Sequence, residues 1–503
     1  MPESRIERDS MGEMEVPAHA LWGASTQRAV LNFPISGYRV GRRLIRALGL
    51  IKYAAALANE SLGKLDHKLA TAIKRAAREV IDGRLDDHFV LDVFQTGSGT
   101  STNMNANEVI AHRAMQISTH AEPEAAARGK SEPEAAARGK DRDQGSKGSR
   151  DQGGGVPRVH PNDHVNMGQS SNDVIPAAIH VAVVEALSAD LMPALHKLHQ
   201  ALKAKADAWD DIVKIGRTHL MDATPIRLGQ EFSGYASQVA HANRRLKQKL
   251  IALRELPIGG TAVGTGINTH PDFARRVCEV LNHETGQAFH EAANHFEAQA
   301  AKDALVELSG TLKTIAVSLT KIANDIRWLG SGPRCGLGEL SLPAVQPGSS
   351  IMPGKVNPVM CEAVMQVCAQ VVGADAAVTF AATVLGNLDL HTGMPVIAHN
   401  LLEAIRLLAG VVHVFTDKCV AGLEANRRRC TELVEQSLAM CTSLAPLIGY
   451  DAAAAIAKEA AASGKTVRQV ALEKKVLPEA QLNEALDPRA MTMPSDKVWP
   501  ASA

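Results

Sequence analysis

The sequence predicts a mainly α-helical protein in which a bundle of long helices forms the middle of three domains. Two observations predict this fold class. Only 3% of the 503 residues are aromatic although 45% are hydrophobic, so the core must consist of small aliphatic side chains that suit close helix packing. Several long stretches repeat apolar side chains at spacings of three and four, and glycine- and hydroxyl-rich loops separate them.

The predicted N-terminal domain covers residues 1–168. Residues 5–40 are irregular and rich in Pro and Gly, which indicates an extended arm with a short hairpin. Residues 41–91 repeat a helical pattern that breaks at Gly63. Residues 95–105 (QTGSGTSTNMN) place glycine and small hydroxyl side chains before another helix, which suits either an anion site at a helix N-terminus or a plain Ser/Thr cap.

Residues 119–155 differ from the rest of this domain. The decapeptide AEPEAAARGK is followed by the near-identical SEPEAAARGK and then by a charged Gly/Ser stretch. Because this composition cannot bury a core, we expect an exposed, mobile insertion with at most short helical turns.

The predicted central domain covers residues 169–426. Its first helix runs from about Asn172 to about Trp209, bends at Pro193, and is roughly 55 Å long at about 1.5 Å per residue. In the third helix, leucines and isoleucines recur at spacings that alternate between three and four without a fault, which is typical of a heptad seam. Further long helices are expected at about 229–253, 297–328, 358–384 and 395–420.

The remaining residues, 427–503, are alanine-rich and predict a small C-terminal helical domain. The glycine-rich loop 259–266 lacks the βαβ context of a dinucleotide site, so we expect it to pack closely against helices.

The charge balance and the cysteines indicate which partners and which cellular compartment to expect. The formal net charge is zero, and no run is judged long and apolar enough to span a membrane, so no nucleic-acid or membrane partner is expected. Seven scattered cysteines without CxxC spacing indicate reduced thiols in the cytoplasm, and neither a zinc site nor a disulfide framework.

The loop 348–358 (GSSIMPGKVNP) is the most distinctive stretch of the chain. Its glycines and prolines set an unusual backbone, and its serines, lysine and asparagine can surround a small anion. It is not a nucleotide phosphate loop, because its glycines are one residue too far apart and Val356 follows Lys355. The alternative is an ordinary interhelical loop.

Two further polar motifs lie at opposite ends of the first long helix. Asn172 opens the helix, and Thr218-His219 lie beyond its far end, so one chain cannot bring them within hydrogen-bonding distance. Either they serve different sites, or an antiparallel partner supplies the missing motif. A metal pair is an alternative for His160 and His164, but we expect Pro161 to oppose a helix there and no third ligand is evident.

GSSIMPGKVNP resembles the signature loop of the fumarase/aspartase superfamily. With QTGSGTSTNMN and GRTHLMDATP, the chain resembles the class II fumarases from about Arg5 to about Met493. The resemblance implies a homotetramer in which the long helices form a shared multi-helix core and three chains build each active site. It also implies a metal-independent lyase without a cofactor, which hydrates the small dicarboxylate fumarate reversibly to (S)-malate in the tricarboxylic acid cycle.

The resemblance also implies roles for individual residues. Ser349 is the base, which requires stabilisation of its oxyanion, and His219, paired with Glu362, is the acid that protonates the departing group of an aci-carboxylate intermediate. Lys355 holds the substrate carboxylate and the intermediate. The implied substrate-binding residues are Ser98, Gly99, Thr100, Ser170, Ser171, Asn172, Thr218, Ser350, Lys355, Val356 and Asn357. A second dicarboxylate site is implied at His160, Pro161, Asn162 and Asp163.

Other activities remain as alternatives. Aspartase-like members tend to carry glutamine where this chain has His219, so fumarate hydratase comes before aspartate ammonia-lyase. Departures from the family pattern at Met221, His112, Lys302 and 391–393 leave hydration of methylated fumarates open. A purely structural helical protein would need the heptad seam but not the polar loops.

Overall fold

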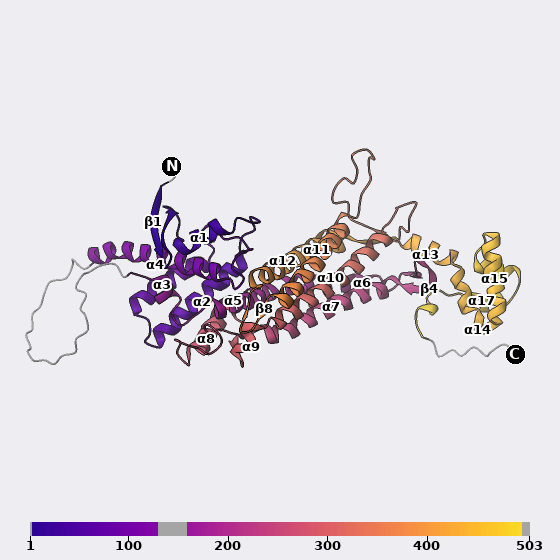
Figure 1. The fold of residues 1–503 in the computed structure, drawn as a ribbon. Coiled ribbons are helices and arrows are strands. Elements are labelled where there is room, and N and C mark those ends of the chain that lie inside the picture. Colours follow the sequence, from indigo (N-terminus) through magenta and orange to yellow (C-terminus); the bar gives the residue numbers. More distant parts are fainter. Residues whose placement is uncertain (1–2, 129–157, 495–503) are drawn as a thin grey trace, which may run out of the picture. The chain divides into compact units, whose positions relative to one another are not determined.

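The computed structural model describes residues 3–128 and 158–494 and confirms the mainly helical prediction (Figure 1). The chain divides into two compact units, and each long helix of the bundle contributes to both. Unit 1 consists of Met1–Ser188, Gln248–Gly310 and Ala374–Ala404, and unit 2 consists of Ala189–Lys247, Thr311–Gly373 and Ile405–Ala503. The division into three domains stays a prediction.

Unit 1 begins with an antiparallel hairpin, β1 (Ser4–Asp9) and β2 (Gly12–Pro17), as predicted. Helix α1 (Ala24–Asn32) follows where we expected irregular chain. Its formation depends on the carboxylate of Glu108, which accepts hydrogen bonds from the backbone N–H groups at the start of α1. Sequence periodicity cannot reveal a cap that comes from a distant residue.

The next three helices pack together, and two of them contact the start of the first long helix. They are α2 (Arg42–Ser61), α3 (His67–Ile81) and α4 (Thr100–Arg128), and α2 and α4 both contact α5 (Ser171–Ala186). Gly63, between α2 and α3, has a φ of 67°, which confirms the predicted break.

Helix α4 extends into the predicted insertion, where we expected at most short helical turns. The stretch AEPEAAAR, which ends at Arg128, consists largely of strong helix formers, so it prolongs a helix that has already nucleated. The remainder of the insertion, up to residue 155, lies outside the described residues.

Near Pro193, where we predicted a bend, the first long helix is interrupted by a π-helical turn. Helix α5 leads into a π-helical turn, η3 (Leu187–Leu191), and then into α6 (Met192–Ala208). The π-helical turn lies directly before the proline, whose missing N–H cannot serve a regular helical hydrogen bond.

The other long helices match their predicted spans, with one break. They are α7 (Leu228–Leu253), α10 (Asp303–Leu329), α11 (Val359–Val384) and α12 (Met394–Lys418). The third predicted helix is split into α9 (His295–Ala300) and α10, and the ammonium of Lys302 donates to the carbonyl oxygens of Gln299 and Ala301 at this break. Every apolar residue of the heptad seam, from Leu305 to Ile326, is at most 1% exposed, which confirms the seam.

Short strands and helices complete both units. Unit 2 contains the hairpin β3 (Val213–Thr218) and β4 (Met221–Arg227). Its C-terminal helices pack around a core that includes Val434, Ile456 and Leu482, and this confirms a small helical region. These helices are α13 (Arg427–Gln436), α14 (Ala445–Ile448), α15 (Tyr450–Ser463), α16 (Val467–Glu473) and α17 (Glu479–Ala485). The remaining elements are η1 (Asp86–His88), η2 (Pro161–Val165), β5 (Glu255–Leu256), α8 (Phe273–Thr285), β6 (His290–Glu291), β7 (Leu340–Ser341), β8 (Gly386–Asn387), β9 (Leu390–His391), η4 (Val420–Gly422), β10 (Glu424–Ala425), η5 (Leu438–Ser443) and η6 (Ala490–Thr492).

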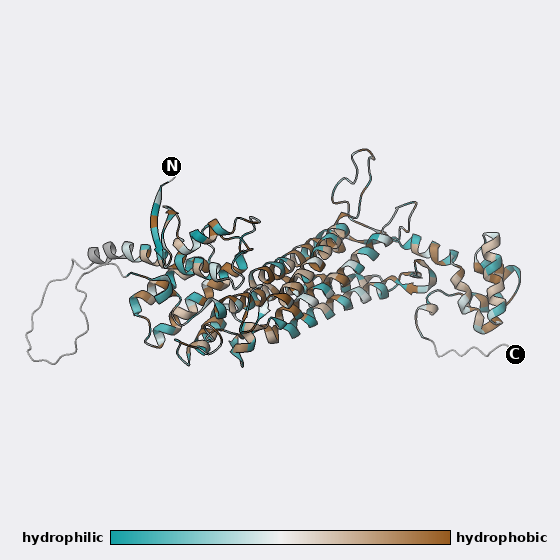
Figure 2. Cartoon of the chain, in the orientation of Figure 1, coloured by the Kyte–Doolittle hydropathy of each residue, from teal (hydrophilic) through white to brown (hydrophobic). Residues whose placement is uncertain are grey.

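Three helical runs are long and apolar enough to cross a membrane by length and composition, which corrects the expectation that none is. The runs are Ser171–Ala208, Val359–Val384 and Met394–Gly422, and hydrophobic residues recur along these helices (Figure 2). The apolar window of the first run is 78% buried within the chain, whereas that of the second is only 33% buried. Helices that pack on several sides in a bundle reach the same hydropathy as membrane segments.

Candidate active site

Unit 1 gathers three of the predicted hydroxyl groups at two helix N-termini. The Oγ1 atom of Thr100, at the start of α4, lies 2.8 Å from the Oγ of Ser98 and 2.8 Å from the Oγ of Ser171, at the start of α5. Gly99 has a φ of 72°, and a Cβ there would lie 2.9 Å from Ile175, so this close approach requires glycine. Hydroxyls beside two helix N-termini form a setting that favours a carboxylate.

The same helix start fixes the next two predicted residues. The Oγ of Ser170 accepts a hydrogen bond from the N–H of Asn172, and the carboxylate of Asp173 accepts one from the N–H of Ser170, which completes a capping box. The side-chain amide of Asn172 donates to the carbonyl oxygen of Ala262, at 2.8 Å. The orientation of the Asn172 amide therefore depends on the loop that contains Ala262.

Two buried charged residues, whose roles were not predicted from the sequence, support this group. Asp173 is fully buried, and burial raises the pKa of its carboxyl to about 6. Lys52 is also fully buried, and burial lowers the pKa of its ammonium to about 7. The spacing Ser170-x-x-Asp173 is a capping-box signature, and Lys52 occupies the apolar face of α2, so both positions carried a readable signal.

The predicted second dicarboxylate site lies on the π-helical turn η2. The Nδ1 of His160 accepts a hydrogen bond from the N–H of Asp163, and the N–H of His160 donates to the Nδ1 of His164. The expectation that Pro161 opposes a helix here is wrong, because Pro161 is the first residue of η2, where its missing N–H is not needed. Among residues 3–128 and 158–494, no group of three or more His, Cys, Asp or Glu side chains could hold a metal ion.

In unit 2, Thr218 and His219 lie at the tip of the β3–β4 hairpin. Thr218 pairs with Met221, so His219 and Leu220 are the two central residues of the turn. Their φ angles are 57° and 61°, both in the left-handed region that such turns usually fill with asparagine and glycine. Backbone strain of this kind is concentrated at functional sites, which supports a role for His219.

A buried cluster of charges holds the strand that leads to this tip. The guanidinium of Arg217 donates to both carboxylate oxygens of Glu339, at 2.8 and 3.1 Å. The ammonium of Lys214 lies 3.5 Å from Glu339 and 3.2 Å from Glu231. Glu339 is fully buried and Lys214 is 1% exposed, so the hairpin is fixed from behind while its tip is exposed.

The signature loop folds back on itself in unit 2. The N–H of Gly348 donates to the carbonyl oxygen of Lys355, and the side-chain amide of Asn357 donates to the carbonyl oxygen of Gly348. The Oγ of Ser349 accepts hydrogen bonds from the N–H groups of Ile351 and Met352, at 3.3 and 3.1 Å. Two N–H groups directed at one serine oxygen stabilise negative charge on it.

The structure brings Ser98, Thr100 and Ser171 into mutual contact, whereas the predicted residues of unit 2 lie on three segments, the β3–β4 tip, the signature loop and the start of α11. Ser98, Gly99, Thr100, Ser170, Ser171 and Asn172 form the group in unit 1, and Thr218, His219, Ser349, Ser350, Lys355, Val356, Asn357 and Glu362 belong to unit 2. The pairing of His219 with Glu362 stays a prediction.

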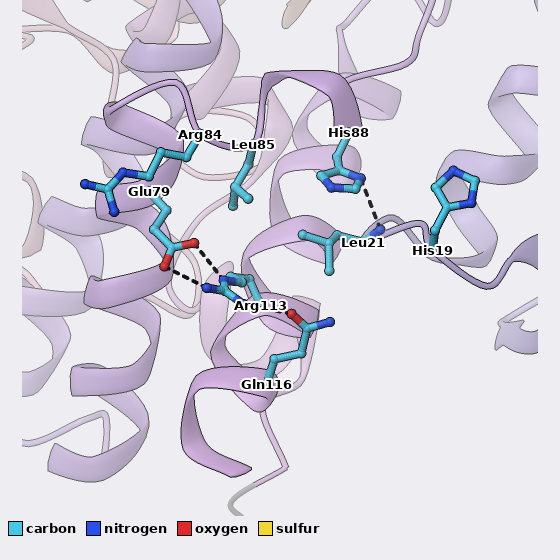
Figure 3. Close-up of a pocket in the computed structure, with 8 residues that line it drawn as sticks. All are labelled: His19, Leu21, Glu79, Arg84, Leu85, His88, Arg113 and Gln116. Atoms are coloured by element: carbon cyan, nitrogen blue, oxygen red, sulfur yellow. Dashed lines mark hydrogen bonds and ion pairs between the residues drawn. The ribbon is translucent and has the colours of Figure 1, made fainter. Parts of the chain in front are cut away.

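A pocket of about 440 Å³ in unit 1 contains none of these residues (Figure 3). Arg113, one of the two arginines that line it, donates to both carboxylate oxygens of Glu79, at 2.6 and 3.0 Å. Burial and the nearby His19 lower the pKa of His88, whose Nδ1 accepts a hydrogen bond from the N–H of Leu21. These side chains largely satisfy one another.

Comparison with known proteins matches nearly the whole chain. Residues 12–373 match the Lyase family model, and residues 440–493 match the Fumarase C C-terminus model. A class II fumarate hydratase of Halobacterium salinarum is 54% identical, with 97% of each chain covered, and one of Corynebacterium glutamicum is 51% identical, with 97% of this chain and 96% of that protein covered. A crystal structure of class II fumarase from Schistosoma mansoni is 38% identical and has a TM-score of 0.88, with 98% of this chain and 100% of that chain covered.

Proposed function

The chain belongs to the class II fumarate hydratase family, and we propose that it hydrates fumarate reversibly to (S)-malate with the residues assembled in units 1 and 2. The geometry of Ser349 is the observation that carries this proposal. A serine is a poor base unless its oxyanion is stabilised, and the two backbone N–H groups of Ile351 and Met352 supply this stabilisation.

In this proposal, Ser349 removes a proton beside a substrate carboxylate in the malate-to-fumarate direction. Negative charge then develops on that carboxylate as an aci-carboxylate, and Lys355 and Asn357 stabilise it. His219, paired with Glu362, protonates the departing hydroxyl, or activates water in the reverse direction. The left-handed backbone at His219 supports this role.

The hydroxyls and amide of unit 1 bind the substrate carboxylates. Ser98, Thr100 and Ser171 already lie within hydrogen-bonding distance of one another in a single chain. A carboxylate can therefore replace their mutual contacts without a backbone rearrangement. The second dicarboxylate site at His160–Asp163 remains part of the proposal.

We further propose a homotetramer in which three chains complete each site. Its support is the apolar surface that one chain leaves open on α11, where Val372, Phe380 and Val384 are 44%, 70% and 47% exposed. Exposed apolar side chains on a long helix are typical of an interface with further helices. A cytoplasmic location is supported by seven cysteines that are all free thiols.

A mixing experiment tests the reaction and the shared site together. We expect His219→Asn and Asn172→Ala each to lower kcat/KM for fumarate by about 10²–10⁴-fold, because one removes the acid and the other a substrate contact. Unfolding and refolding an equimolar mixture of the two variants is expected to restore activity, because mixed tetramers contain some sites with both native residues. Activity is followed through the ultraviolet absorbance of fumarate.

The controls separate the possible failures. Each variant refolded alone must stay inactive, whereas Ser349→Ala refolded together with Asn172→Ala must regain activity as the first mixture does. Mixtures that stay inactive while forming tetramers contradict the shared site. Turnover of aspartate in place of malate identifies an ammonia-lyase, and full activity of His219→Asn and Ser349→Ala rejects the proposed roles.

A further inference from the structure

The carboxylate of Asp173 joins two segments that are far apart in the sequence. One of its oxygens accepts the N–H of Ser170, at 2.9 Å, and the other accepts the N–H groups of Gly259 and Thr261, both at 3.0 Å. Asp173 is fully buried, so these donors have no water to replace it. The carboxylate thus ties the start of α5 to the loop 259–266.

That loop determines where the Asn172 amide points. The carbonyl oxygen of Ala262 accepts the hydrogen bond from the Asn172 side chain, and Ala262 directly follows Thr261. Thr261 has a φ of 56°, a left-handed conformation that is strained in a β-branched residue. The hydrogen bond from its N–H to Asp173 helps to hold this conformation, and with it the position of the Ala262 carbonyl.

Lys52 holds the segment that precedes the helix. Its ammonium donates to the side-chain oxygens of Asn166 and Gln169, at 2.8 and 3.0 Å. The same oxygen of Asn166 accepts a hydrogen bond from Asn103 of α4, at 3.2 Å. Lys52 therefore connects α2, α4 and the turn that leads to Ser170. Its positive charge also compensates the negative charge of the buried Asp173 carboxylate.

We propose that Asp173, supported by Lys52, is a positioning residue that fixes the Asn172 amide for the substrate through the loop 259–266. Neither charged side chain touches the substrate. The inference rests on the proposed role of Asn172 in substrate binding. It explains why a strained backbone at Thr261 and two buried charges occur beside a group of small hydroxyls.

The test is a double-mutant cycle between Asp173→Asn and Asn172→Ala in the full-length oligomer. Asparagine keeps the shape of the side chain but cannot accept hydrogen bonds at both ends. We expect Asp173→Asn alone to raise KM for fumarate by about 10–100-fold, with a smaller change in kcat, because a displaced contact loses binding. In the Asn172→Ala background the same change is expected to alter KM less than about threefold, since the affected contact is already absent.

Glu108→Gln is the matched control. Glu108 is also a buried carboxylate that accepts three backbone N–H groups, those of Gly23, Ser25 and Thr26, but its partners belong to none of the predicted site segments. We expect it to lower the thermal midpoint as Asp173→Asn does while KM changes less than about twofold. If Asp173→Asn does not fold, Asp173→Glu replaces it, because glutamate keeps the negative charge but displaces the carboxylate. We expect Asp173→Glu to raise KM for fumarate as well, but less than Asp173→Asn.

Three results separate the outcomes. An equal KM effect of Asp173→Asn with and without Asn172 contradicts the positioning role. So does an unchanged KM in Asp173→Asn when Asn172→Ala alone raises it. An unchanged KM in Asn172→Ala instead contradicts the proposed site assignment, whatever Asp173→Asn does.

Discussion

The two units hold their functional segments in different ways. In unit 1, buried carboxylates accept backbone N–H groups directly, as Asp173 does at the start of α5. In unit 2, the hairpin is held by buried ion pairs between side chains, centred on Glu339. The signature loop has neither device and is closed by hydrogen bonds between Gly348, Lys355 and Asn357.

The proposed binding residues of unit 1 and the proposed catalytic residues of unit 2 also differ in their exposure to solvent. The hydroxyls of unit 1 are buried or partly buried, and they bond to one another within one chain. His219, Ser350 and Lys355 of unit 2 are exposed in the single chain. The hydroxyls of unit 1 are therefore preorganised within one chain, whereas in the proposed mechanism the groups of unit 2 need further surface around them to exclude water.

The largest expected effect comes from the ion pairs of unit 2. Glu339→Gln leaves the guanidinium of Arg217 and the ammonium of Lys214 buried with less compensating charge. We expect the free energy of unfolding to fall by about 3–5 kcal/mol, as for other broken buried pairs. Urea unfolding of the purified protein measures the change, and kcat is expected to fall with it because the hairpin carries His219.

An exposed ion pair of the same unit provides the control. Asp211 accepts two hydrogen bonds from Arg427, at 2.7 and 3.2 Å, but both side chains are more than half exposed. Asp211→Asn is expected to leave the urea midpoint and kcat unchanged, because water screens the pair. If Glu339→Gln and Asp211→Asn lower the free energy of unfolding equally, burial does not make the Glu339 ion pairs more stabilising than the exposed pair.

Periodicity predicted the long helices because each depends on its own apolar face, and the seam from Leu305 to Ile326 is fully buried as expected. Features that depend on a distant polar group were not predictable in this way. Helix α1 depends on Glu108, 85 residues from Gly23, and the turn at His219 has none of the usual asparagine–glycine signal. The residue types of the candidate site were readable, but their hydrogen-bond partners were not.

Asp92, another buried carboxylate of unit 1 that accepts backbone N–H groups, is expected to have a smaller, pH-dependent effect on the free energy of unfolding. Burial opposes ionisation of Asp92, but the N–H groups of Phe94, Ser36 and Gly37 and the Ser36 hydroxyl lower its pKa from 3.8 to about 2. Because the folded pKa lies below the unfolded value, its charge stabilises the fold above pH 3.8, and this stabilisation is lost as the pH falls through about 2.

Asp92→Asn should therefore lower the free energy of unfolding at neutral pH by on the order of 2 kcal/mol. Urea midpoints measured at successively lower pH should show the difference in stability between Asp92→Asn and the unsubstituted protein becoming smaller. Asp173, whose pKa is raised to about 6, has the opposite sign: its contribution is present below 3.8 and is lost as the pH rises through about 6. If the difference in the free energy of unfolding between Asp92→Asn and the unsubstituted protein stays constant with pH, the ionised Asp92 carboxylate does not stabilise unit 1.

The smallest expected effect lies at the strained tip of unit 2. Leu220 has a φ of 61° and is 70% exposed, so its side chain contributes little packing while its backbone is strained. Leu220→Gly is expected to raise the free energy of unfolding by about 1 kcal/mol, because glycine adopts this conformation without a steric penalty. Met221 is 69% exposed but lies in strand β4, so Met221→Gly should destabilise instead. If Leu220→Gly and Met221→Gly lower the free energy of unfolding equally, the tip of the β3–β4 hairpin stores no strain. The exposed turn with His219 is then held as in an ordinary hairpin.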